Sequence, residues 1–92
     1  MTGVGLQHLH KMPRLESLWL RFSRITDAGL IHVKGLKNLK FLELSITRVS
    51  DAGLDHLKGL TKLELLDLSA TRVTDAGVKQ LEQALPDCLI SN

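Results

Sequence analysis

Residues 26–49 read TDAGLIHVKGLKNLKFLELSITRV, and residues 50–73 read SDAGLDHLKGLTKLELLDLSATRV. The two stretches are identical at 15 of 24 positions without a gap. Residues 2–25 keep the same register, with 9 of 24 identities to residues 50–73, and residues 74–92 begin a fourth copy that stops early. Self-similarity at a fixed period predicts a repeat architecture, so the chain is expected to be one domain of stacked units.

Each unit changes its hydrophobic period halfway along. In residues 51–60, leucines recur at every third position, at Leu54, Leu57 and Leu60, which predicts a helix. In residues 63–68 the apolar residues alternate instead, which predicts a short strand. Every strand is reached by the same crossover, so the sheet should be parallel. Helices pack ~8–10 Å apart and strands only ~4.8 Å apart, so the helical side should be convex and the strand side concave.

Each of the last three helical segments begins with a hydroxyl residue followed by an aspartate. The hydroxyl is predicted to cap the helix by accepting an N–H that lacks a partner. The aspartate is predicted to lie in the first turn, where the helix dipole favours negative charge. These residues are Thr26, Asp27, Ser50, Asp51, Thr74 and Asp75. Two glycines, Gly35 and Gly59, are expected to end their helices in a left-handed conformation.

Composition narrows the class of protein further. Leucine accounts for 20 of 92 residues, and the formal net charge is only +2, which does not favour nucleic acid or an anionic membrane as a partner. No apolar run approaches the ~20 residues of a membrane span. The single cysteine excludes an intramolecular disulfide framework. It fits a reducing compartment, and the first eleven residues lack the anatomy of a signal peptide; both features favour a cytoplasmic location.

Three copies of the motif L-x-x-L-x-L, beginning at Leu15, Leu39 and Leu63, resemble the signature of the leucine-rich repeat family. The position that holds asparagine in that signature holds a hydroxyl residue here, which looks like a bacterial subclass of 24-residue repeats. The resemblance covers essentially all of residues 1–92. It implies an α/β fold, a right-handed solenoid that forms a short horseshoe arc, with parallel strands on the concave face and helices on the convex face.

The resemblance also implies a function: binding of a protein or peptide on the concave face, without catalytic residues or a cofactor. The hydroxyl residues at the asparagine position fall where the chain turns off each strand into the core. There an inward hydroxyl can satisfy backbone groups that would otherwise be buried without partners. This structural ladder consists of Ser23, Thr47 and Thr71.

Alternate residues of each predicted strand should point to the concave surface. The exposed serines expected there are Ser17, Ser45 and Ser69. The predicted partner-binding residues are three apolar anchors bordered by charge, a pattern typical of interface hot spots. They are Trp19, Phe41, Leu65, Glu43, Asp67 and Arg21. Alternatively, Trp19 only shields an edge strand, or the exposed apolar side chains are incidental.

Other recurring residues do not predict chemistry. A histidine recurs every 24 residues on successive helices, but ~8–10 Å of separation prevents convergence on one metal ion. An arginine series is expected to pair with the aspartates, leaving little net charge for an anionic partner. These two series are His8, His32 and His56, and Arg24, Arg48 and Arg72. With one residue inserted, Cys88 takes the place of Leu63 and should pack as a small apolar residue rather than act as a nucleophile.

The two ends leave open how the chain is used. The last unit ends in polar residues that suggest a partial cap, whereas the first unit has no obvious cap. The chain is either the C-terminal piece of a longer array or a complete protein whose first unit improvises a cap, helped by self-association. The functional hypothesis is a non-enzymatic binding module. Its alternative is a structural spacer or a unit that forms homo-oligomers through its exposed ends.

Overall fold

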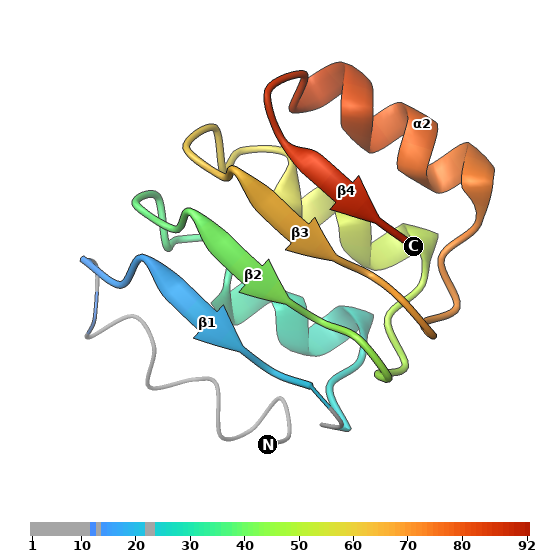
Figure 1. The fold of residues 1–92 in the computed structure, drawn as a ribbon. Helices are drawn as coiled ribbons and strands as arrows, with labels where there is room; N and C mark the ends of the chain where they lie inside the picture. Colours follow the sequence, from blue (N-terminus) through green and yellow to red (C-terminus); the bar gives the residue numbers. More distant parts are fainter. Residues whose placement is uncertain (1–11, 13, 22–23) are drawn as a thin grey trace.

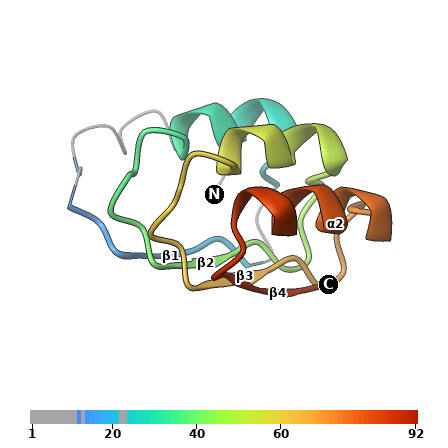
Figure 2. The same ribbon diagram turned by 90° about the horizontal axis from the view of Figure 1, so that it is seen from above.

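The computed structural model describes residues 12, 14–21 and 24–92 (Figure 1). Its elements comprise four strands, two 3-10 helices labelled η, and one α-helix. In chain order they are β1 (Ser17–Trp19), η2 (Asp27–His32), β2 (Phe41–Glu43), η3 (Asp51–Leu57), β3 (Leu65–Asp67), α2 (Asp75–Ala84) and β4 (Leu89–Ser91). Figure 2 shows two layers, with the strands in one and the helices in the other.

The four strands form one parallel sheet in the order β1-β2-β3-β4, as the sequence predicts. Phe41 pairs with Ser17 on one side and with Leu65 on the other, and Leu65 pairs with Leu89. Neighbouring strands are therefore offset by 24 residues throughout, the period read from the sequence. This fixed offset places equivalent side chains of successive units beside one another.

The hydrophobic core lies between the two layers. The middle residue of each of the first three strands, Leu18, Leu42 or Leu66, is buried, while the residues that flank it are exposed or half-buried. The helical layer contributes the facing side chains, and fully burying each leucine stabilises the fold by about 1.5–3 kcal/mol. Buried residues from the helices include Leu30, Leu54, Leu57, Val78 and Leu81.

The helical segments of the second and third units are 3-10 helices, whereas that of the fourth unit is an α-helix. The expected left-handed glycines are wrong, since no described glycine has a positive φ. Right-handed residues end these helices instead: Val33 after η2 has φ −85°, and Lys58 after η3 has φ −62°. The left-handed residues lie after the strands, where Ile46 and Ala70 both have φ 56°.

The predicted N-caps are correct at one helix only. Thr74 Oγ1 accepts a hydrogen bond from Gly77 N–H at 3.2 Å, whereas Thr26 and Ser50 make no side-chain cap. Ser50 uses its hydroxyl differently, because Ser50 Oγ donates to a carboxylate oxygen of Asp27 in the preceding unit. Thr74 Oγ1 also donates to a carboxylate of the preceding unit, that of Asp51, but it still accepts the N–H of Gly77 and so caps its own helix.

Asp27 and Asp51 join successive units rather than pairing with arginines. Asp27 Oδ1 also accepts the N–H of Ser50 at 2.7 Å. Asp51 repeats the arrangement one unit later, accepting Thr74 N–H at 2.8 Å and Thr74 Oγ1 at 2.5 Å. The expected ion pairs with the arginine series are therefore wrong. The carboxylates have hydrogen-bond donors closer at hand, and the ion pairs found among the described residues involve other groups.

Acid should weaken this junction between units. Hydrogen bonds from the side chain and N–H of Thr74 hold the pKa of Asp51 below its ordinary value of 3.8. A carboxylate with a lowered pKa stabilises the fold above its unfolded-state pKa, and that contribution is lost as pH falls through the folded-state pKa. We expect the urea midpoint to drop between pH 5 and pH 2, and Asp51→Asn to flatten that drop. An unchanged pH profile in Asp51→Asn would contradict the junction role.

The fourth unit contributes the last strand of the described sheet, β4. Cys88 is buried in the core, and its N–H donates to Leu85 C=O at 3.1 Å, just as Leu63 N–H donates to Leu60 C=O at 3.0 Å. Burial raises the pKa of the Cys88 thiol from 9.0 to about 11, which keeps it protonated and a poor nucleophile at neutral pH. The outward residues of α2 are exposed and mostly polar, namely Lys79, Gln80, Glu82 and Gln83.

Candidate interaction face

The face of the sheet that lies away from the helices is not covered by any described element, and we call it the open face (Figure 2). The first and third residue of each strand project here. The strand register arranges them into two rows. The apolar row consists of Phe41, Leu65 and Leu89. The polar row consists of Trp19, Glu43, Asp67 and Ser91.

The apolar row is contiguous and accessible. Phe41 is 37% exposed, Leu65 42% and Leu89 71%. Their strands are hydrogen-bonded neighbours, so successive side chains lie ~4.8 Å apart along the row. Trp19, at 66% exposure on strand β1, lies beside Glu43 in the polar row. An exposed apolar strip of this kind is the usual character of a surface that binds another molecule.

Leu89 belongs to this surface, although the sequence analysis did not include it. The inserted residue in the last unit places Cys88 25 positions after its counterpart Leu63, one more than the period, but β4 returns to the 24-residue offset. Counting 24 residues from Leu65 would have found Leu89. The insertion before Cys88 suggested an offset of 25 residues for the whole last strand, so the pairing of Leu89 with Leu65 was not predicted.

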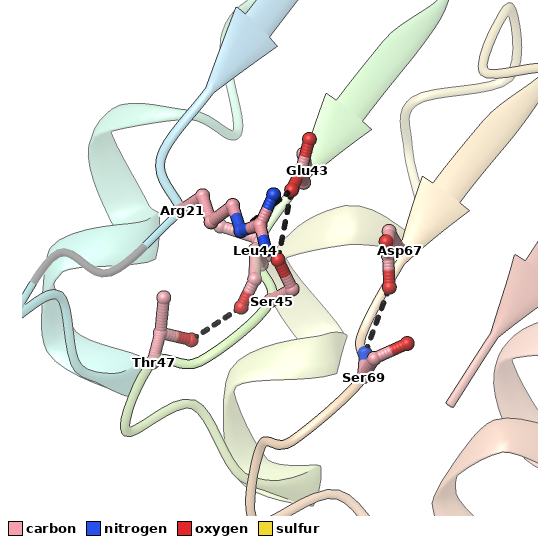
Figure 3. Close-up of polar contacts among 7 residues, drawn as sticks. All are labelled: Arg21, Glu43, Leu44, Ser45, Thr47, Asp67 and Ser69. Atoms are coloured by element: carbon pink, nitrogen blue, oxygen red, sulfur yellow. Dashed lines mark hydrogen bonds and ion pairs between the residues drawn. The ribbon is translucent and has the colours of Figure 1, made fainter.

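A small polar network connects the last residue of β2 with residues that follow β1 and β2 (Figure 3). Ser45 Oγ donates a hydrogen bond to Glu43 Oε1 at 2.8 Å, and Arg21 Nε lies 3.9 Å from the same oxygen. Ser45 is buried, with 5% exposure, so the expectation of an exposed serine is wrong. At the equivalent position of the next unit, Ser69 is half-buried.

Asp67 is the second carboxylate of the polar row. Its Oδ1 accepts the N–H of Ser69 at 2.9 Å (Figure 3). Hydrogen bonding by Ser69, through its side chain and its N–H, lowers the pKa of Asp67, and the charge of Arg21 adds a smaller contribution. Asp67 is therefore ionised at neutral pH and carries a full negative charge next to the apolar row.

The two threonines of the predicted structural ladder lie behind this face. Thr47 is buried, and its Oγ1 donates to Leu44 C=O at 2.7 Å (Figure 3). Thr71 Oγ1 donates to Leu68 C=O at 2.6 Å and accepts Val73 N–H at 3.3 Å. Both hydroxyls thus bond to backbone in the turn after the strand. Ser23 lies outside the described residues.

A second feature of the surface is a polar hollow, whose cations are largely paired. A hollow of about 360 Å³ at the strand entry edge is lined by Arg14, Glu16, Asn38, Lys40 and Lys62. Two of its cations already have partners, since Lys62 Nζ donates to Asn38 at 2.9 Å and Lys40 Nζ lies 3.6 Å from Glu16. Within the described residues, no three histidine, cysteine or acidic side chains gather as a metal site would need. His8 lies outside those residues.

None of the helices in the described part has the length and apolar character to cross a bilayer. The parallel sheet and its layer of helices are those of a repeat protein built from strand and helix units, with an open sheet face as its candidate site. The leucine rich repeat family model matches residues 13–73, about two thirds of the chain. The chain belongs to the leucine-rich repeat family, whose members typically bind other proteins and are generally not enzymes. No curated protein matches the sequence.

Proposed function

We propose that the chain is a non-catalytic module that binds a protein or peptide on its open face. The observation that carries this proposal is the contiguous apolar row, bordered on the same face by an ionised Asp67 and by the Arg21–Glu43 pair. Apolar anchors beside charge favour both affinity and orientation of a partner. A sheet joined by backbone hydrogen bonds presents these side chains rigidly, which reduces the entropy lost on binding.

The shape of the solenoid forms part of the same proposal. Crossovers between parallel strands are right-handed in ~98% of cases, which favours a right-handed solenoid. Because helices need more lateral space than strands, the open face is the one expected to be concave. Residues 1–92 then form one array whose first unit is residues 2–25.

The size of the face limits the partner. Four strands spaced ~4.8 Å apart span only ~15 Å between the outer strands. A standard interface buries ~800 Å² on each partner, which exceeds what such a narrow surface can supply alone. The module by itself is suited to a short peptide segment or a small epitope.

A comparison of variants tests the proposal. The double variant Trp19→Ala plus Phe41→Ala should lose a protein that the unchanged chain retains from a lysate of its source cells. The matched control is Ile31→Ala, because Ile31 is 54% exposed but lies on helix η2 in the other layer. Circular dichroism must first show that all three proteins are folded. Equal retention by all three would contradict binding on the open face.

Self-association is the rival function, since β1 and β4 each have one edge without a neighbouring strand in the described sheet. Light scattering after gel filtration separates the two functions. The binding proposal expects a monomer whose mass does not respond to Trp19→Ala. A dimer that dissociates when Trp19 is made charged would favour the rival.

A further inference from the structure

We propose that the segment bound on the open face presents a cationic side chain, arginine or lysine, to Asp67. The inference rests on the proposed function and specifies the chemistry of its partner. It follows from the balance of charge in the polar row, from the neighbours of Asp67 and from the exposed apolar side chains beside it.

The polar row has one negative charge more than its own cation can balance. Glu43 and Asp67 are two carboxylates, and among the residues that the structure describes Arg21 is the cation found beside them, with its Nε 3.9 Å from Glu43 Oε1. On its other side Asp67 neighbours Ser91, which carries no charge. The charge of Arg21 also acts on Asp67, but one cation can balance only one of the two carboxylates, so these three side chains keep one net negative charge.

The hydrogen bond from Ser69 orients Asp67 without neutralising it. Ser69 N–H donates a hydrogen bond to Asp67 Oδ1, and a backbone amide carries no formal charge. Asp67 is half-buried rather than fully exposed. An ion pair formed there loses less strength to solvent screening than one at a fully exposed site.

The apolar row supplies what a long cationic side chain needs besides a counter-ion. Leu65 lies two residues before Asp67 on the same face of β3, and Leu89 lies beside Leu65 on β4. Arginine and lysine bury their aliphatic stems on apolar surface while the charged head group stays outside. A stem packed on Leu65 and Leu89 brings its head group to Asp67. An acidic segment would instead meet the charge of Asp67 without compensation.

Two synthetic probes isolate this charge. The first is the peptide Ac-Ser-Leu-Arg-Leu-Ser-amide, and the second replaces its arginine with citrulline, which has nearly the same shape but no charge. Titrations followed by the backbone and indole N–H signals of the labelled protein report both affinity and location. The arginine probe should bind about threefold or more tightly than the citrulline probe at low salt, and the difference should shrink as salt rises.

Three variants should change the binding of the arginine probe in different directions. Asp67→Asn should remove the preference for arginine over citrulline. Ser91→Lys should weaken the arginine probe, because it places a cation next to Asp67. Arg21→Gln should strengthen it roughly threefold by releasing Glu43 from its partner. Asp55→Asn is the control, because Asp55 is an exposed carboxylate on η3, paired with Lys58 at 2.9 Å and away from the open face.

The outcomes separate this inference from the proposed function. A preference for arginine that is lost in Asp67→Asn and enhanced in Arg21→Gln supports it. Equal binding of both probes at signals of Phe41 and Leu65 overturns the cation requirement while leaving the open face as a binding surface. A preference for arginine that survives Asp67→Asn, or that Asp55→Asn abolishes, places the cation elsewhere and also overturns it.

Discussion

Replacing Gly53 with alanine should lower the free energy of unfolding by roughly 2–3 kcal/mol. A Cβ atom at this position would overlap Asp27 Oδ1 and would lie 2.9 Å from Leu30 Cδ1. Asp27 has little freedom to move aside, because its carboxylate holds both the N–H and the hydroxyl of Ser50. The added methyl group therefore either strains the contact between η2 and η3 or breaks the junction between their units.

The matched control is Gly35→Ala, because Gly35 lies in the preceding unit, three residues after the end of η2 at His32. No atom lies within 4 Å of a Cβ built at Gly35, and its φ is not positive. This change should raise stability by about 0.4–1 kcal/mol, because alanine has less conformational freedom in the unfolded chain. Urea unfolding followed by circular dichroism measures both variants. Equal effects at Gly53 and Gly35 would show that the close approach does not constrain the fold.

A double-mutant cycle identifies the contact responsible. In an Asp27→Ala background the carboxylate is absent, so Gly53→Ala should cost much less than it does in the unchanged chain. Ser50 will have lost its bonds in both members of that comparison, so the difference isolates the overlap with Asp27. An unchanged cost would instead implicate Leu30.

The periodic features of the fold could be predicted from the sequence. Leucine spacing identified the strands, and the 24-residue period gave their parallel order and the register of Phe41 with Leu65. Both follow from burial: an alternating strand has one apolar face, and identical units stack identically. The apolar side chains expected on the open face, Trp19, Phe41 and Leu65, are accessible for the same reason.

The bonds between units could not be predicted, because they depend on which of several donors comes nearest. From the sequence, Asp51 could serve its own helix, pair with an arginine or bind the next unit. In the structure it binds Thr74. The positions of the left-handed residues could not be predicted either. Glycine is the usual signal for that conformation, and the chain has Ile46 and Ala70 there instead.

The candidate site was predicted in outline and not in its details. The alternation of side chains along a strand placed Glu43 and Asp67 on one face. It could not show that Ser45 is buried and donates a hydrogen bond to Glu43. It also omitted Leu89, the most exposed large apolar side chain of the described residues, because an insertion broke the period just before β4. Local irregularities of this kind decide the composition of an interaction surface.

Replacing Thr47 with valine should cost about 1–3 kcal/mol of unfolding free energy. Valine has nearly the shape of threonine but cannot donate a hydrogen bond, so Leu44 C=O would lose the partner it has at 2.7 Å. Thr47 is only 7% exposed, so water cannot readily replace the hydroxyl. A buried carbonyl left unpaired carries the full cost of its desolvation.

Thr47→Ser keeps the hydroxyl, so it should retain more stability than Thr47→Val. Thr71→Val should cost less than Thr47→Val, because Thr71 is half-buried and water can reach the freed carbonyl. Arg48→Ala, at the exposed neighbouring position, should change the urea midpoint least of all. If Arg48→Ala were more damaging than Thr47→Val, the hydroxyl would not be what completes the turn. The stability of each unit would then have to come from contacts of exposed side chains such as Arg48, rather than from the hydrogen bond of Thr47 to Leu44 C=O.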